Sequence, residues 1–293
     1  MSATRPHATS IATVCLSGTL PEKLEAAAAA GFDGVEIFAK DLQDFPGSAA
    51  EIRRLAAALH LDILLYQPFR DFEAMPVEQF AGNMVRAAQA FDVMEALGTD
   101  LVLVCSNVQD AAIDDPERAA ADLWQMAEAA SQRGLRVGYE ALAWGRHVRH
   151  WRQAWDIVQR AGHPALGLIL DSFHTLALGA SLGESVTDSL RGIDAVPADR
   201  LFFVQLADAP RMALDVLSWS RHHRNFPGQG ELAVTEFTHA VLQTGYTGPL
   251  SLEIFNDVFR VTPPQPVARD GLRALHEVAA QVASHAASAT LRS

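Results

Sequence analysis

The sequence predicts a closed barrel of eight parallel strands with helices outside it, the (β/α)8 or TIM barrel, as a single α/β domain over residues 1–293. Three observations support this fold class. Eight short apolar runs recur along the chain, and alanine-rich segments with helical spacing separate them over about 280 residues. The first run is followed only by Ser17-Gly18-Thr19. This is not the glycine-rich fingerprint that a doubly wound sheet needs for a dinucleotide.

The elements follow one another in strict alternation. Strands are predicted at residues 11–17, 34–38, 62–67, 100–105, 136–141, 167–171, 201–206 and 249–255. Helices are predicted at residues 21–30, 48–59, 77–97, 116–132, 151–161 and 231–244. Gly31 and Gly98 are typical of helix ends, because glycine readily adopts positive φ. We expect the folded core to span about residues 10–282, with frayed tails at both ends, the second beginning at Ala283.

Composition narrows the function classes. Of the 293 residues, 49% are hydrophobic, which suits one large core. The net charge of −12 repels phosphate backbones and anionic membranes, so we expect a small-molecule partner and no nucleic acid or membrane. Cys15 and Cys105 lie inside apolar runs and indicate neither a disulfide framework nor a thiolate zinc site. The first residues lack the apolar stretch of a signal peptide, so a cytoplasmic protein is expected.

Polar residues close four consecutive predicted strands. They are Glu140, Asp171, Gln205 and Glu253, on strands five to eight. In such barrels the reactive groups lie at the carboxyl ends of strands, so we expect these side chains to converge at the barrel mouth. Three carboxylates this close need a counter-charge, and all-oxygen ligation suits Mg²⁺ or Mn²⁺. The alternative is that they cap helices or pair with arginines.

His174 follows Asp171 by three residues, which places an imidazole above the predicted metal site. It is the best candidate for a general base, although it could instead cap the next helix or fix Asp171. Glu36 ends the second predicted strand. It could bind a substrate hydroxyl or pair with an arginine across the mouth, and the sequence does not decide between these roles.

Arginines follow the third and seventh strands. Arg70, Arg221 and Arg224 are predicted on loops over the mouth of an acidic protein, where they suggest a bound carboxylate. Pairing with surface acids is the alternative. Which of the three holds the carboxylate is left open.

Several motifs together resemble a known superfamily. The run Gly-Val-Glu-Ile-Phe, the acid of strand five, Asp-x-x-His of strand six, Pro-Gly-x-Gly-Glu and the Ser-Leu-Glu of strand eight resemble the xylose-isomerase-like barrels of sugar isomerases, epimerases and endonuclease IV. The resemblance covers about residues 10–280. Two stretches, Tyr-Gln-Pro-Phe-Arg-Asp-Phe-Glu (66–73) and Ser-Arg-His-His-Arg-Asn-Phe-Pro-Gly-Gln-Gly-Glu (220–231), narrow it further. With Gln205 where sugar epimerases usually carry histidine, they resemble bacterial 3-dehydroshikimate dehydratases of quinate and shikimate catabolism.

That resemblance implies a set of roles. It implies metal ligands Glu140, Asp171, Gln205 and Glu253, a catalytic base His174, and substrate contacts from Arg70, Ser220 and Arg224. To these we add Glu140 as a second catalytic residue and Tyr66 as a further substrate contact. The implied reaction converts 3-dehydroshikimate to protocatechuate through base-assisted enediolate formation and loss of water. Some members carry a dioxygenase-like domain after the barrel, and we expect the site to need only the barrel.

Other functions remain as alternatives. A ketose isomerase or epimerase would use the same metal ligands, but the arginines and the aromatic residues Phe69, Trp219 and Phe226 favour a carboxylated ring. Nucleic-acid repair is opposed by the net charge. A Schiff-base dehydratase needs a lysine in the mouth, and of the two lysines only Lys40 is near a strand end. A non-catalytic barrel and a homo-oligomer also remain possible.

Overall fold

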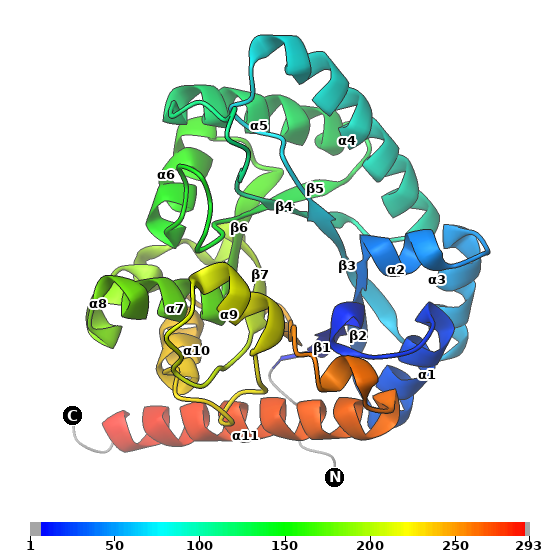
Figure 1. The fold of residues 1–293 in the computed structure, drawn as a ribbon, viewed down its shortest axis with the longest axis vertical. Coiled ribbons are helices and arrows are strands. Elements are labelled where there is room, and N and C mark those ends of the chain that lie inside the picture. Colours follow the sequence, from blue (N-terminus) through cyan, green and yellow to red (C-terminus); the bar gives the residue numbers. More distant parts are fainter. Residues whose placement is uncertain (1–6, 291–293) are drawn as a thin grey trace.

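The computed structural model describes residues 7–290 and confirms the predicted closed barrel. Eight parallel strands pair in chain order, and β1 pairs with β8 to close the ring. Figure 1 shows the strands around the centre with the helices outside them. The strands are β1 (Thr9–Ala12), β2 (Gly34–Phe38), β3 (Asp62–Phe69), β4 (Leu101–Cys105), β5 (Arg136–Glu140), β6 (Leu166–Asp171), β7 (Leu201–Leu206) and β8 (Leu250–Leu252).

Helices connect successive strands and cover the outside of the barrel. They are α1 (Leu20–Ala30), α2 (Ala39–Asp44), α3 (Ala49–Ala58), α4 (Val77–Leu97), α5 (Pro116–Ser131), α6 (Trp151–Ala161), α7 (Ser172–Leu182), α8 (Val186–Leu190), α9 (Val216–His222), α10 (Val234–Gln243) and α11 (Pro264–Thr290). Short 3₁₀ turns are η1 (Thr13–Cys15), η2 (Ile193–Ala195), η3 (Ala198–Arg200) and η4 (Phe259–Val261). Local sequence sets the helix ends: Ser48 caps α3 in a capping box with Glu51, and Gly31 ends α1 at φ 97°.

Alternation along the strands produces two apolar layers. On β4, Leu101 and Leu103 point into the barrel, whereas Val102 and Val104 pack toward the helices. The interior layer consists of Leu65, Leu101, Leu103, Cys105, Leu142, Ile169 and Phe203. Gly138 belongs to this interior, because a Cβ there would clash with Ile169. The barrel is therefore filled by side chains, and its polar groups gather at the carboxyl ends of the strands.

The structure differs from the prediction at both ends of the chain. The first strand ends at Ala12 rather than residue 17, because the chain turns into η1 at Thr13, whose hydroxyl accepts a hydrogen bond from the Phe38 N–H. Helix α11 continues to Thr290, past Ala283, where we expected fraying. Residues 1–6 and 291–293, which include the outer parts of the predicted tails, lie outside the described residues. Among residues 7–290, no helix has the length and apolar character required to cross a membrane.

Candidate active site

The four predicted strand-end residues are all buried at the carboxyl ends of β5 to β8. Glu140 and Asp171 are the last residues of β5 and β6, Gln205 lies next to Asp171 in the β6–β7 register, and Glu253 directly follows β8. Parallel strands end on the same side of a barrel, so these groups share one end of it. The structure thus confirms that the four residues lie at the mouth of the barrel.

Arg224 lies inside this cluster and also lines the cavity at the mouth, and its substrate contact stays a prediction. It is 1% exposed, and its Nη1 donates to Asp171 Oδ2 at 2.7 Å and to Glu253 Oε2 at 3.0 Å. Ser220 Oγ accepts from Nε and Nη2 of the same guanidinium at 3.1 and 2.8 Å. Burial lowers the pKa of Arg224, but Asp171 and Glu253 more than offset this and raise it above its ordinary value. Arg224 is thus the counter-charge of the acids in this structure.

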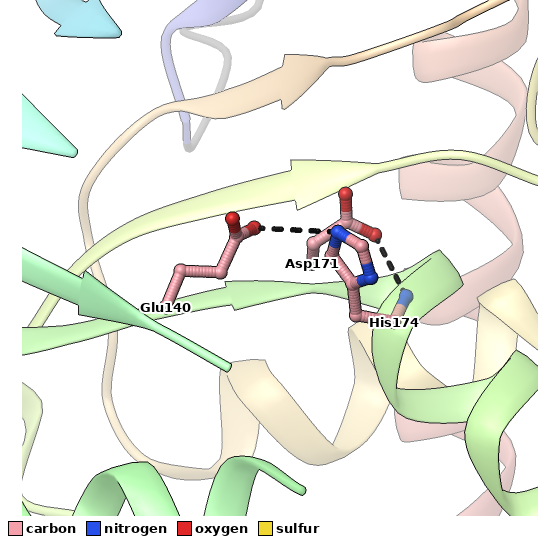
Figure 2. Close-up of side chains that lie close together, drawn as sticks. All are labelled: Glu140, Asp171 and His174. Carbon is pink, nitrogen blue, oxygen red and sulfur yellow. Dashed lines mark hydrogen bonds and ion pairs between the residues drawn. The ribbon is translucent and has the colours of Figure 1, made fainter. Parts of the chain in front are cut away.

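Glu140, Asp171 and His174 form a compact group, shown in Figure 2. Each offers a potential ligand atom, and these atoms lie within 4.8 Å of one another. His174 Nε2 lies 4.0 Å from Glu140 Oε1. Asp171 Oδ1 caps α7 by accepting from the N–H groups of Phe173 and His174, at 2.5 and 3.2 Å. The cap fixes Asp171 and, through the first turn of α7, the position of the imidazole.

The surroundings of His174 favour a neutral ring. The Ala143 N–H donates to Nδ1 at 3.2 Å, and Arg224 Nη2 faces Nε2 at 3.2 Å. A protonated imidazole has no acceptor to offer either donor, whereas the neutral ring has one. Burial, followed by the charge of Arg224, lowers the pKa of His174 well below its usual value. A neutral histidine at this place can take up a proton.

Two buried oxygen atoms of the cluster lack hydrogen-bond partners: Glu140 Oε1 and Gln205 Oε1. Burial, with the charges of Glu253 and Asp171, raises the pKa of Glu140 well above its usual value. Unpartnered buried oxygens and converging carboxylates are unfavourable unless a cation is present. Three carboxylates and one amide oxygen are the hard ligands that Mg²⁺ and Mn²⁺ prefer, so the residues fit such an ion.

The other predicted substrate contacts divide into two groups. Arg70 and Arg221 line the cavity at the mouth, as predicted for groups that meet an anion. Ser220 is fully buried and its Oγ accepts a hydrogen bond from Arg224, so the structure shows it supporting that side chain, and its substrate contact stays a prediction. Tyr66 packs into the layer between strands and helices, because alternation along β3 turns Gln67 inward instead. Its position does not support a substrate contact.

The aromatic side chains that line the mouth are not the ones that were predicted. Trp144 and Phe255 border the cavity, and the Arg221 guanidinium lies over both rings, 5.7 and 5.1 Å from their centroids. Trp219 instead packs edge-on against Phe173, and neither Phe69 nor Phe226 lines the cavity. The loops after β5 and β8 therefore supply the aromatic wall, with Trp144 and Phe255 in place of the predicted residues.

Two further polar residues join the site. Glu36 is completely buried and accepts hydrogen bonds from Gln67 Nε2 at 3.0 Å, Gln205 Nε2 at 2.7 Å and Ser251 Oγ. Neither expectation for Glu36 describes this arrangement, since it bonds amides and a hydroxyl of the protein. Gln67 was missed. An amide within the otherwise apolar end of a strand was the signal that could have found it.

Comparisons with known proteins agree with the barrel fold. The family model described as xylose isomerase-like TIM barrel matches residues 24–278. A curated 3-dehydroshikimate dehydratase of Pseudomonas aeruginosa is 59% identical over 266 residues, which cover 91% of this chain and 41% of that protein. A Neurospora crassa protein of the same name is 28% identical, with 83% of each chain covered.

One solved structure is also closely similar. It is described as a xylose isomerase-like TIM barrel/4-hydroxyphenylpyruvate dioxygenase fusion protein, and it matches with a TM-score of 0.87 at 56% identity. The match covers 92% of this chain and 42% of that chain. The chain therefore spans less than half the length of this protein and of the Pseudomonas aeruginosa relative.

Proposed function

This chain belongs to the xylose isomerase-like TIM barrel family, and we propose that it dehydrates 3-dehydroshikimate to protocatechuate with the help of a divalent cation. The observation that carries the proposal is His174, whose Nδ1 accepts a hydrogen bond from the Ala143 N–H, beside converging carboxylates at a mouth lined by Arg70 and Arg221. The name of the Pseudomonas aeruginosa relative supports this substrate. The Neurospora crassa relative, covered over 83% of its length, supports assigning the activity to the barrel.

Glu140, Asp171, Gln205 and Glu253 would hold the cation, for which we propose Mg²⁺ or Mn²⁺. The unpartnered oxygens of Glu140 and Gln205 support this assignment. When bound, the ion supplies a Lewis acid that withdraws electron density from substrate oxygens. Asp171 and Glu253 now share Arg224, so a cation binding to those two oxygens would compete with that guanidinium.

His174 would act as the general base. In 3-dehydroshikimate the ring ketone acidifies the hydrogen on the adjacent hydroxyl-bearing carbon, and a neutral imidazole can accept that proton. Passing the proton to the departing β-hydroxyl releases one water and restores the neutral ring. Tautomerisation of the remaining ring then gives the aromatic product, which makes the reaction favourable. Glu140, 4.0 Å from His174 Nε2, would stabilise the transient imidazolium.

Arg70 and Arg221 would bind the substrate carboxylate. Both line the mouth cavity, and Arg221 is held over Trp144 and Phe255. A guanidinium can bind a carboxylate through two parallel hydrogen bonds, which fixes orientation as well as position. A neutral ketose offers no such anion, so this pair favours the carboxylated ring over an open sugar.

The test is an assay of the full chain. Protein stripped of metal and then supplied with Mg²⁺ or Mn²⁺ is mixed with 3-dehydroshikimate, and protocatechuate is followed by its ultraviolet absorbance. We expect product only with the metal present. A silent assay, combined with interconversion of ketoses by the same preparation, would replace this proposal by a sugar isomerase.

A further inference from the structure

We propose that Glu36 is a positioning residue that orients the amides of Gln205 and Gln67, and through them sets which oxygen atoms face the cation. The inference rests on the metal site of the proposed function. It assigns a role to a residue that lies outside the predicted ligand set and does not line the mouth cavity. Glu36 is completely buried, and its side-chain hydrogen bonds go to Gln67, Gln205 and Ser251.

The amide of Gln205 has only one favourable orientation beside Glu36. Glu36 Oε2 accepts hydrogen bonds from two amides, and an amide oxygen cannot donate one, so the NH₂ end of Gln205 must face it. Accordingly Gln205 Nε2 donates to Glu36 Oε2 at 2.7 Å. The other end, Oε1, is buried and has no partner. Glu36 therefore holds the amide oxygen toward the place where a cation ligand is needed.

Gln67 extends this control to a second ligand. Its Nε2 donates both to Glu36 Oε2 at 3.0 Å and to Glu253 Oε1 at 2.8 Å. This shared donor ties the Glu253 carboxylate to Glu36, while Arg224 holds its other oxygen. Glu36 thus acts on two of the four predicted ligands, one directly and one through Gln67.

Glu36 is itself fixed by Ser251 and by no charged partner. The Ser251 hydroxyl donates to Glu36 Oε1, which leaves Oε2 to the two amides. Among residues 7–290, no arginine or lysine forms an ion pair with Glu36. An arginine there would satisfy the carboxylate without fixing any amide. In other metalloproteins, loss of a hydrogen bond that orients a metal ligand typically weakens metal binding by about 10- to 100-fold.

The decisive variant keeps the carboxyl group of Glu36 but shortens the side chain. Glu36→Asp retains a carboxylate but withdraws it by one methylene from Gln205 and Gln67. We expect the folded variant to bind Mn²⁺ about 10- to 100-fold more weakly, measured from the electron paramagnetic resonance signal of free Mn²⁺. Glu73→Asp is the matched control, because Glu73 is also buried but contacts none of the predicted ligands. Its Mn²⁺ affinity should equal that of the wild type, even if its melting temperature falls.

Ser251→Ala provides a second, milder test. Among the described contacts, the Ser251 hydroxyl bonds only to Glu36, so its removal acts on the ligands through Glu36. We expect Mn²⁺ affinity to fall about tenfold. When Ser251→Ala is combined with Glu36→Asp, it should weaken Mn²⁺ binding little further, because both substitutions act on the hydrogen bonds of the same carboxyl group. Should Glu36→Asp not fold, Ser251→Ala alone decides, and an unchanged affinity would overturn the inference.

The outcomes separate the inference from the proposed function. If the wild type binds no Mn²⁺, the proposed metal site fails. If the wild type binds Mn²⁺ and folded Glu36→Asp binds it equally well, the metal site stands and the positioning role of Glu36 is rejected. A structural role alone would lower the melting temperature of Glu36→Asp and leave its Mn²⁺ affinity unchanged.

Discussion

Two clusters of buried carboxyl groups differ in how their charge is neutralised. The mouth cluster contains Glu140, Asp171 and Glu253 with the guanidinium of Arg224 among them. The second cluster centres on Glu73, in the loop after β3, where Oε1 accepts from the Asn107 N–H at 2.6 Å and from a tyrosine hydroxyl at 2.9 Å. Each cluster contains a carboxyl oxygen without a partner. Among residues 7–290, the mouth acids Asp171 and Glu253 form ion pairs with an arginine and Glu73 forms none.

The Glu73 cluster shows what does not define an active site. Burial raises the pKa of Glu73 to about 7, and the residue borders a cavity of about 320 Å³ between α5 and α6. A buried group, a shifted pKa and a cavity therefore occur together away from the mouth. One carboxyl can be neutralised by one proton, whereas three that converge also require a positive charge. Convergence, more than burial, distinguishes the functional cluster.

Glu253→Ala, in the mouth cluster, should have the largest effect on activity. It removes one proposed metal ligand, and we expect turnover of 3-dehydroshikimate to fall by about 10³-fold or more, because a bound metal contributes several kcal/mol to such reactions. Metal content after gel filtration should fall as well. Retained turnover with full metal content would show that Glu253 is not a ligand.

His174→Ala tests the base without removing a ligand. Turnover should fall by about 10² to 10⁴-fold, the usual contribution of a positioned acid or base. Bound metal, measured by elemental analysis, should match the wild type, because none of the four proposed ligand side chains is changed. A parallel loss of metal and activity would instead make His174 a ligand alongside Glu140 and Asp171.

Glu73→Gln should change stability and its pH dependence, with turnover near that of the wild type. The folded pKa of Glu73 is about 7, above the ordinary value of 4.5, so the folded state binds the proton more tightly. Its contribution to stability is complete below about pH 4.5 and is lost as pH rises through about 7. The glutamine does not titrate, so the variant should gain about 3 kcal/mol relative to wild type across that window.

Urea unfolding at pH 5 and pH 8 measures this difference. Tyr139 and Asp122 are the titratable groups that shift the pKa of Glu73, and both are kept in the variant. A difference in unfolding free energy that is the same at both pH values would show that Glu73 is ionised in the folded state throughout.

The fold and the positions of the candidate ligands could be predicted because both depend on local patterns. Short apolar runs marked the strands, and the rule that reactive groups lie at strand ends selected Glu140, Asp171, Gln205 and Glu253. The closed order of the barrel then placed them at the same end of it. The alternation of strands with helices and the count of eight strands were sufficient to predict these positions.

Contacts across the barrel could not be predicted in the same way. Alternation places Gln67 inward, but only the closed ring brings it between Glu36 and Glu253. Arg224 was predicted on a loop over the mouth. Its position in a loop could not reveal that its side chain also bonds to the acids, as it does to Asp171. Tyr66 was selected from its neighbourhood in the sequence, although neighbours in a strand point to opposite faces.

The most direct test is a crystal structure of the protein grown with Mn²⁺, with anomalous data that locate the ion. We expect one peak with oxygen atoms of Glu140, Asp171, Gln205 and Glu253 within about 2.5 Å. Arg224 Nη1 should have left its place between Asp171 and Glu253, since ion and guanidinium compete for the same two oxygens. Arg224 still bridging both carboxylates at millimolar Mn²⁺, with no anomalous peak among the four side chains, would contradict the metal site and the function proposed from it.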